Sequence, residues 1–252
     1  MRSERKIPGL ALLLPALVFC GWELAAFQGW IDPVFFPPPS TLARTAQRLL
    51  SSGDLPRAVM ATLGRAILGF IPGAMAGIAM GIATGVSPSI RRICEPSLAG
   101  LYSMPKLALF PIVLLVLGAG ESARFALIAL AAFLGMSMQV FDGVRSIDAG
   151  YVEMARNYGA SPWMLLRRVY LPGAMPSIFT GARITFGRAL VIAISVELVT
   201  GSAGLGSMIW LAWQTFSTER LFVGVLAAGL LGFITQSILR AVEKRVAPWR
   251  HA

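Results

Sequence analysis

Between two long apolar segments, the chain carries the polar sequence Glu153-Met154-Ala155-Arg156-Asn157-Tyr158-Gly159-Ala160-Ser161-Pro162, which runs on to Leu171-Pro172. Several of these residues are types that begin or end helices. Gly159 suits the left-handed position that ends a helix, Ser161 is a favourable N-cap, and Pro162 fits the first turn of a following helix. The pattern predicts two short helices joined by a tight turn. Order in a polar insert of this kind suggests that another molecule docks on it.

The composition is that of a membrane protein. Of the 252 residues, 56% are hydrophobic and only 13% are charged, and the mean hydropathy is +0.71, far from an ordinary soluble domain. The net charge of +10 does not indicate nucleic-acid binding, because the basic residues flank apolar segments instead of forming one basic surface with interleaved aromatics. We therefore expect contact with membrane lipid and none with nucleic acid.

Six segments are apolar enough to cross a membrane as helices, since a spanning helix needs about 20 mainly apolar residues. They are residues 8–28, 57–86, 94–117, 122–141, 176–200 and 221–241. Proline and glycine interrupt several spans, notably at Pro72-Gly73 and, in the third span, at Pro105 and Pro111. Such breaks release backbone groups that neighbouring helices or cavity water must satisfy. They suit a transport pathway, although glycine and proline are also common in membrane helices without one.

The connector at residues 31–56 is predicted to lie on the outer face. It holds Pro37-Pro38-Pro39, after which Ser40-Thr41 are expected to cap a short helix that ends before Gly53.

Lysine and arginine orient the spans. Six spans place one group of basic residues on a single side: Arg2, Arg5, Lys6, Arg91, Arg92, Arg145, Arg156, Arg167, Arg168, Arg240, Lys244, Arg245 and Arg250. The other side holds Arg44, Arg48, Arg57, Arg124 and Arg220. The positive-inside rule puts the richer side, with both termini and the polar insert, in the cytoplasm. In an alternative, residues 1–26 form a cleaved signal peptide, which would leave five spans.

The polar insert resembles the EAA loop of ABC importer permeases, whose pattern is Glu-Ala-Ala, three further residues, Gly, and later a hydrophobic-Pro pair. Glu153, Ala155 and Gly159 occupy the Glu, second Ala and Gly positions, and Leu171-Pro172 matches the closing pair. Met154 replaces the first Ala, a mild departure because methionine is a good helix former.

Further segments resemble the nitrate, sulfonate and taurine branch of that family, and they occur in the expected order over most of residues 35–245. These segments are 102–108 (Tyr-Ser-Met-Pro-Lys-Leu-Ala), 117–121 (Leu-Gly-Ala-Gly-Glu), 143–148, 159–163, and Glu197-Leu198 followed by Gly204-Leu205-Gly206.

The resemblance implies an all-α membrane protein with six transmembrane helices, a type I ABC importer transmembrane domain. Residues 1–55 would form the first span and the outer connector, and residues 56–245 the transmembrane domain, with its EAA loop at about 142–173. The expected role is the permease subunit of an ATP-driven importer in a bacterial cytoplasmic membrane. Its solute would be a small anion such as a sulfonate, taurine or nitrate.

The resemblance also implies partners. They are ABC ATPase subunits, a second permease copy and an external solute-binding protein. Contact with the ATPase is carried over to Glu153, Ala155, Gly159, Leu171 and Pro172.

The chain lacks the residues for catalysis of its own. A P-loop needs Gly-Lys-Ser/Thr, and none of the three lysines, Lys6, Lys106 and Lys244, follows a glycine. We therefore expect no enzyme activity and no cofactor in this chain, with ATP bound by the partner subunit. The single histidine, His251, supports neither a catalytic triad nor a zinc site. Cys20 and Cys94 show no metal-ligand spacing and are expected to be small buried apolar residues.

Six charged residues lie at least three residues inside the ends of the predicted spans: Glu23, Arg65, Lys106, Arg183, Arg188 and Glu197. Ionisable groups in a bilayer are costly and usually face an interior. Glu23 is expected to anchor the interface, and Arg65 to pair or to extend toward the membrane surface. Arg183 and Arg188, five residues apart, do not share one narrow helix face.

Pathway candidates are Met104, Pro105 and Lys106 at the proline break, and Glu197 before the glycine turn. Lys106 is suited either to attract an anionic solute or to bind carbonyls freed by the break. Glu197 is suited to brace the glycine turn by accepting backbone N–H groups or by pairing with a cation.

Two other classes fit the sequence less well. A secondary transporter or channel would more often carry acidic or histidine proton relays within its spans, and a membrane-embedded enzyme would need a convergent catalytic set.

Overall fold

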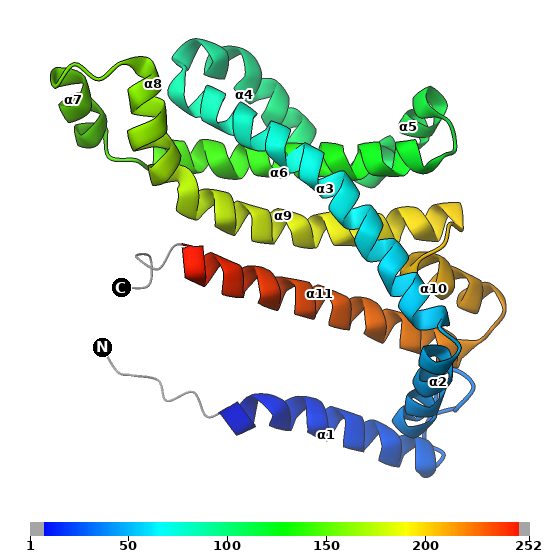
Figure 1. Ribbon diagram of the computed structural model, residues 1–252. Helices are drawn as coiled ribbons and strands as arrows, with labels where there is room; N and C mark the ends of the chain where they lie inside the picture. The colour runs from blue at the N-terminus through cyan, green and yellow to red at the C-terminus, as the bar shows by residue number, and fades with distance from the viewer. Residues whose placement is uncertain (1–7, 247–252) are drawn as a thin grey trace.

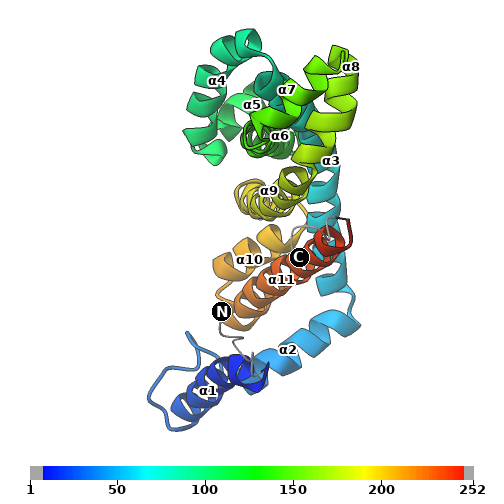
Figure 2. The ribbon, with the colours of Figure 1, turned by 90° about the vertical axis from the view of Figure 1, so that its left-hand side faces the viewer.

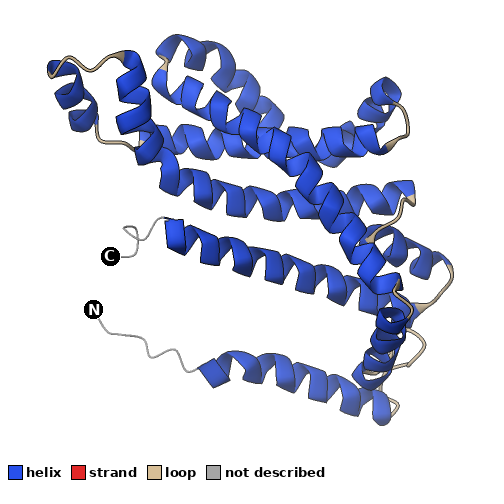
Figure 3. Ribbon diagram, in the orientation of Figure 1, coloured by secondary structure: helices blue, strands red, loops and turns tan. Residues whose placement is uncertain are grey.

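Helices form the whole framework in the computed structural model, which describes residues 8–246; no strand occurs in this range (Figure 3). The elements are α1 (Pro8–Phe27), α2 (Pro39–Ser51), α3 (Asp54–Val86), α4 (Pro88–Ser103), η1 (Lys106–Leu109), α5 (Phe110–Leu117), α6 (Glu121–Arg145), α7 (Ala149–Asn157), α8 (Pro162–Leu165), η2 (Leu166–Tyr170), α9 (Leu171–Thr200), α10 (Leu205–Gln214) and α11 (Thr218–Val246).

The predicted spans all fall on helices, but length and composition do not support the full count of six. Among the described residues, α3, α6 and α11 are each long and apolar enough to cross a membrane. Two bent pairs raise this number to five if each is one span: Pro88–Ser103 with Lys106–Leu117, bent by 96°, and Pro162–Thr200 with Leu205–Gln214, bent by 41°. Helix α1 contributes a shorter apolar stretch, Leu13–Phe27.

The long helices lie one above another, and the connections gather at two opposite ends. Figure 1 shows α1, α11, α9 and α6 in roughly parallel rows, with α3 crossing them obliquely. The start of α1, the end of α11, the α3–α4 junction and the α7–α8 segment lie at one end, and α2, α10 and the α5–α6 turn lie at the other. Figure 2 shows the same layers from the side, with α1 farthest from the α4–α8 region.

Helices α3 and α6 form the most extensive helix pair, and they approach closely because α3 presents a glycine at every fourth residue. The ladder comprises Gly69, Gly73, Gly77, Gly81 and Gly85. A Cβ atom on Gly77 would lie 2.6 Å from the carbonyl oxygen of Phe133 and 2.7 Å from the Cβ of Met136. Small residues at this spacing let membrane helices pack backbone to backbone, which supplies van der Waals attraction where lipid gives no hydrophobic driving force.

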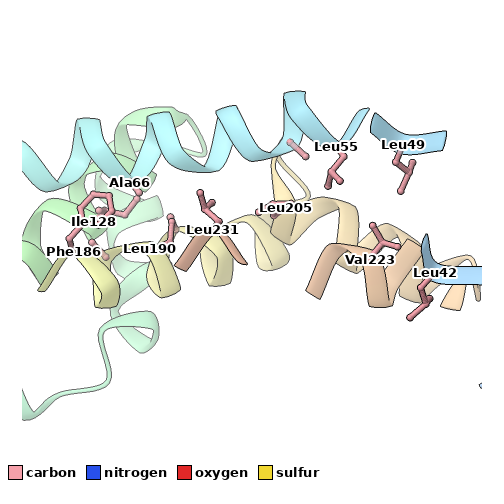
Figure 4. Packing of buried hydrophobic residues seen from close by; sticks show 13 residues of the cluster. Leu42, Leu49, Leu55, Ala66, Ile128, Phe186, Leu190, Leu205, Val223 and Leu231 are labelled. Carbon is pink, nitrogen blue, oxygen red and sulfur yellow. The ribbon is translucent and has the colours of Figure 1, made fainter. Parts of the chain in front are cut away.

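Buried apolar side chains from α2, α3, α6, α9, α10 and α11 pack together in one cluster (Figure 4). Its labelled members include Leu49, Ile128, Phe186, Leu205 and Val223. Many other large apolar residues stay exposed, among them Leu14, Phe27 and Leu115. In a membrane protein such exposure is expected, because lipid tails are as apolar as these side chains.

Two predictions about local structure are wrong. Pro72 lies inside α3 without interrupting it; the lost N–H costs one hydrogen bond, and the adjacent Gly73 packs against the α6 backbone.

Ser40 and Thr41 do not cap α2 but lie within its first turn. The backbone N–H of Ser40 instead donates to the Glu23 carboxylate at 3.0 Å. Glu23 thus joins α1 to the N-terminus of α2, where a negative charge is favourable.

Gly53 ends the connector as expected, with φ +78° between α2 and α3. The sequence did not predict helix α10, which follows the Gly204 turn.

We predict that Gly77→Ala lowers the free energy of unfolding by about 1–3 kcal/mol, because the added methyl group overpacks the α3–α6 contact. The matched control is Gly64→Ala on the same helix, where an added Cβ meets nothing within 4 Å. That control should stabilise the helix by about 0.5–1 kcal/mol. Thermal unfolding of the detergent-purified variants measures both, and equal effects at the two positions would contradict the packing argument.

Candidate functional site

Local hydrogen bonds, from capping side chains and from the backbone, order the α7–α8 segment (residues 149–170). Asp148 caps α7 by accepting the N–H of Gly150 at 2.8 Å, and Ser161 caps α8 by accepting the N–H of Met164 at 3.3 Å. Between them, Gly159 adopts φ +78°. Its N–H bonds the carbonyl of Arg156 at 2.9 Å, and the Ala160 N–H bonds that of Ala155 at 3.0 Å. This pair of bonds is a Schellman motif, which ends a helix at a left-handed glycine.

The α7–α8 segment is attached firmly on one face and open on the other. Val152, Ala155 and Ala160 pack against the cluster that holds Leu165 and Tyr170 together with α3, α6 and α9 side chains. No residue of α7 is buried. The outward side chains of the α7–α8 segment include Glu153 and the large apolar residues Tyr151 (65% exposed), Met154 (58%) and Tyr158 (88%). A folded protrusion with apolar side chains facing outward is typical of a docking surface.

Leu171-Pro172 lies within a continuous helical stretch and does not interrupt it. The stretch from Pro162 to Thr200 is helical throughout, with a π-helical turn at Leu166–Tyr170 just before the proline. Pro172 has no N–H to donate within the helix, and π-turns often accompany such bends. Figure 1 shows the resulting change of direction between α8 and α9. Leu171 and Pro172 are exposed there.

The predicted break at Pro105 is present, whereas Pro111 lies in the first turn of α5 without breaking it. Helix α4 ends at Ser103, and the chain bends by 96° before η1. The Lys106 ammonium donates to the carbonyl of Tyr102, in the last turn of α4. Lys106 therefore does bind a carbonyl freed by the break, one of its two expected roles.

A cavity of about 860 Å³ opens beside this break, and we call it the Arg188 cavity. It is lined by Tyr102, Pro105, Lys106, Leu107, Ala131, Gly135, Ile184, Gly187, Arg188, Val191, Ile192, Ser195 and Gln236. Of the four pathway candidates, Pro105 and Lys106 line the cavity, while Met104 (43% exposed) and Glu197 do not. Arg188 was not a candidate, because its position in the fold depends on how α9 packs beside the break.

Tyr102 holds the two cations of the Arg188 cavity together. The Arg188 guanidinium donates to the Tyr102 hydroxyl. The guanidinium carbon also lies 5.7 Å from the centre of the tyrosine ring, and the Lys106 nitrogen lies 4.8 Å from it. Both are within the range of a cation–π interaction.

Glu197 lies in a separate buried cluster that ties the α9–α10 turn to α3. Its carboxylate accepts the N–H of Gly206 at 3.0 Å and the Thr62 hydroxyl at 2.8 Å, and it pairs with Arg65. Glu197 is completely buried. These are the bracing contacts considered for it from the sequence.

Arg65 extends this Glu197 cluster to α6. Its guanidinium bonds Glu121 at 2.9 Å and the carbonyl of Ala203 at 3.1 Å in addition to Glu197. A signal for this role was present in the sequence, because Arg65 lies deep within a predicted span and a buried arginine needs an acid. Arg183 finds its acid on α11, where Glu243 lies at 2.9 Å.

The described residues contain no group of three histidine, cysteine or acidic side chains that could hold a metal ion. Cys20 is exposed and Cys94 is half-buried, so the expectation that both are buried is wrong; each lies on a helix whose outer face meets no other part of this chain. His251 lies outside the described residues, as do Arg2, Arg5, Lys6 and Arg250.

The chain belongs to the family described as "Binding-protein-dependent transport system inner membrane component", which matches residues 73–248. It is 34% identical to the "Putative aliphatic sulfonates transport permease protein SsuC" of Bacillus subtilis (strain 168), over 99% of this chain and 93% of that one. The Escherichia coli (strain K12) protein of the same description is 35% identical over 95% and 91%. The "Taurine transport system permease protein TauC" of Escherichia coli (strain K12) is 32% identical over 94% and 87%.

The fold is also that of solved importer structures. The "bacterial ABC transporter involved in the import of the acidic polysaccharide alginate" has a chain that superimposes with a TM-score of 0.67 at 15% identity, covering 96% of this chain and 97% of its own. The chain is therefore a multi-pass ABC importer permease of the sulfonate and taurine branch.

We predict that Glu197→Ala destabilises the protein by about 3–5 kcal/mol, because it leaves the buried Arg65 without its buried partner. Glu121→Gln is the matched control at the other acid of Arg65. Since the Glu121 side chain is 46% exposed, its loss should cost about 1 kcal/mol or less. Chemical denaturation in detergent measures both, and a Glu197→Ala variant as stable as Glu121→Gln would show that the Glu197 cluster does not brace the fold.

Proposed function

We propose that this permease forms the membrane pathway of an ATP-driven importer, with ATP hydrolysed by a separate subunit that docks on the α7–α8 segment. Family membership supports the permease role. The absence of Gly-Lys-Ser/Thr from the sequence supports a separate ATPase. The single observation that carries the proposal is the ordered, outward-facing α7–α8 segment with its left-handed Gly159.

The packing of the α7–α8 segment suits it to transmit force. Its inward face shares one apolar cluster with Ala74 on α3, Met136 and Val140 on α6, and Ala174 on α9. Protein interiors are close-packed and transmit displacement instead of absorbing it. Movement of an ATPase bound to Glu153 and its neighbours would therefore shift the ends of these three helices together.

The proposed orientation puts the α7–α8 segment in the cytoplasm. The start of α1, the end of α11 and the α7–α8 segment lie at the same end of the molecule (Figure 1), and this end carries Arg145, Arg156, Arg167, Arg168 and Lys244. The positive-inside rule supports a cytoplasmic location for that end, and hence for both termini. The opposite end, with α2 and α10, would meet the external solute-binding protein.

A second permease subunit completes the proposed pathway, in the simplest case an identical copy. The Arg188 cavity is open on one side of a single chain, and exposed apolar residues such as Val191 (63%) lie beside it. A partner across this face would enclose the space. Among soluble proteins, cyclic pairs of identical subunits are the commonest oligomers.

The proposed solute is a small anion. Relatives are described as permeases for aliphatic sulfonates and for taurine, and the cavity of this chain carries two cations. Nitrate belongs to the same chemical class. Much of the selectivity of such importers would reside in the solute-binding protein that delivers the solute.

Gly159→Val tests the docking proposal. A β-branched residue is strained at φ +78° by roughly 1 kcal/mol or more, although an added Cβ has open space around it. We expect the variant to insert in the membrane but to lose ATPase copurification and ATP-dependent uptake in proteoliposomes.

Gly159→Asn is the matched control, because asparagine tolerates the left-handed conformation; it should retain most uptake. Normal uptake by Gly159→Val, or uphill transport by the purified chain without an ATPase, would contradict the proposal.

A further inference from the structure

We propose that Tyr102, Lys106 and Arg188 form a binding site inside the membrane for the oxyanion head of a small organic anion. This inference rests on the proposed transport function and assigns the solute contact to three residues. It also adds Arg188 and Tyr102, neither of which the sequence singled out as a pathway candidate.

The first argument is that these two cations lack acidic partners. Among the described residues, Arg65 pairs with Glu121 and Glu197, and Arg183 pairs with Glu243. Neither Lys106 nor Arg188 takes part in an ion pair there, and no residue lining their cavity is acidic. Uncompensated charge within a bilayer is costly and is retained where it meets water or a ligand. An anion is the ligand that would balance it.

The second argument is the depth of the site. Arg188 lies 17 residues after the start of α9 and 12 before its end, which places it roughly 18 Å or more from either helix end at 1.5 Å per residue. Lipid phosphates lie outside the hydrocarbon core, whose edge is about 15 Å from the bilayer centre. A solute in transit reaches this depth, whereas a lipid head group does not.

The third argument is that hydrogen-bond donors remain free. Lys106 has three N–H donors and uses one on the carbonyl of Tyr102. Arg188 has five and uses one on the Tyr102 hydroxyl. Because that hydroxyl accepts from Arg188, its own proton is available to donate. A sulfonate, with three oxygens that only accept, matches this set of donors.

The rest of the lining points to an organic rather than an inorganic anion. Leu107, Ala131, Ile184, Val191 and Ile192 form apolar walls. Transfer of a short alkyl group from water to such walls is favourable, by about 0.8 kcal/mol per buried methylene. An anion with one charged oxygen head and a short apolar tail satisfies both parts of the cavity.

Thiol labelling tests the site without any partner protein. Ser195, which lines the cavity, is replaced by cysteine in a background of Cys20→Ser and Cys94→Ser. The permease in lipid nanodiscs is then treated with anionic sulfonatoethyl methanethiosulfonate and, separately, with cationic trimethylammonioethyl methanethiosulfonate. Each rate is divided by the rate of the same reagent with a small thiol in solution, because the thiolate itself favours the cationic reagent. On this scale we expect the anionic reagent to react at least about tenfold faster, because a charged cleft concentrates ions of opposite sign. Ethanesulfonate should slow that reaction.

The ratio of the two rates assigns the effect to the two cations. Lys106→Gln with Arg188→Gln should bring the ratio close to one, while Lys106→Arg and Arg188→Lys preserve it. Arg92→Gln, an exposed cation on α4 outside the cavity, should leave it unchanged. Continued reaction with the cationic reagent shows that a variant is folded and its thiol accessible.

The same ratio in phospholipid-free detergent would exclude lipid phosphate as the bound anion.

Four outcomes would each overturn the inference. They are equal rates in the Ser195→Cys protein, no reaction with either reagent, a ratio that falls to one in phospholipid-free detergent, and a ratio unaffected by the glutamine variants. Uptake in proteoliposomes with the ATPase and the solute-binding protein separates this failure from failure of the transport proposal. Charge-selective labelling of the Ser195→Cys protein, together with no uptake by the wild-type protein, would refute transport alone. ATP-dependent uptake without charge-selective labelling would refute the anion site alone.

Discussion

The close approach of α3 to α6 supports both the Glu197 cluster and the α7–α8 segment. The glycine ladder lets the two backbones meet along the second half of α3, and in a bilayer such contact supplies attraction that the hydrophobic effect cannot. This pair carries Thr62 and Arg65 to Glu197 at one end of the molecule. At the other end it carries the apolar surface on which the α7–α8 segment rests. A displaced α3 would disturb the Glu197 cluster and the attachment of the α7–α8 segment together.

Charged side chains within the spans fall into two physical classes. Arg65 and Arg183 are neutralised by acids on other helices and hold those helices in place. Lys106 and Arg188 are turned toward an open cavity and share only a tyrosine. Removing a partner from the first class leaves a buried charge unpaired, which costs stability. The second class retains unused donors, so its charge is available to a solute.

Local features were predictable because a few neighbouring residues determine them. The caps Asp148 and Ser161 and the left-handed Gly159 act within their own turns, and Gly159 and Ser161 were identified from the sequence. The break at Pro105 follows from a proline that cannot continue its helix. By contrast, Pro72 showed that the same residue type can lie within a straight span when its neighbour packs against another helix. The glycine ladder on α3 was present in the sequence as a four-residue spacing and was overlooked.

The sequence alone determined the membrane class, the apolar segments, the likeness of the polar insert to an EAA loop and the distribution of positive charge. Only the tertiary structure decided which charges are paired. Arg65 and Glu197 are 132 residues apart in the chain, and Tyr102 and Arg188 are 86 apart. Apolar runs and caps are properties of short segments, whereas the partner of a charged side chain depends on which helices pack together. For that reason the sequence points to Lys106 beside its proline, whereas the role of Arg188 depends on the packing of α9 beside the break.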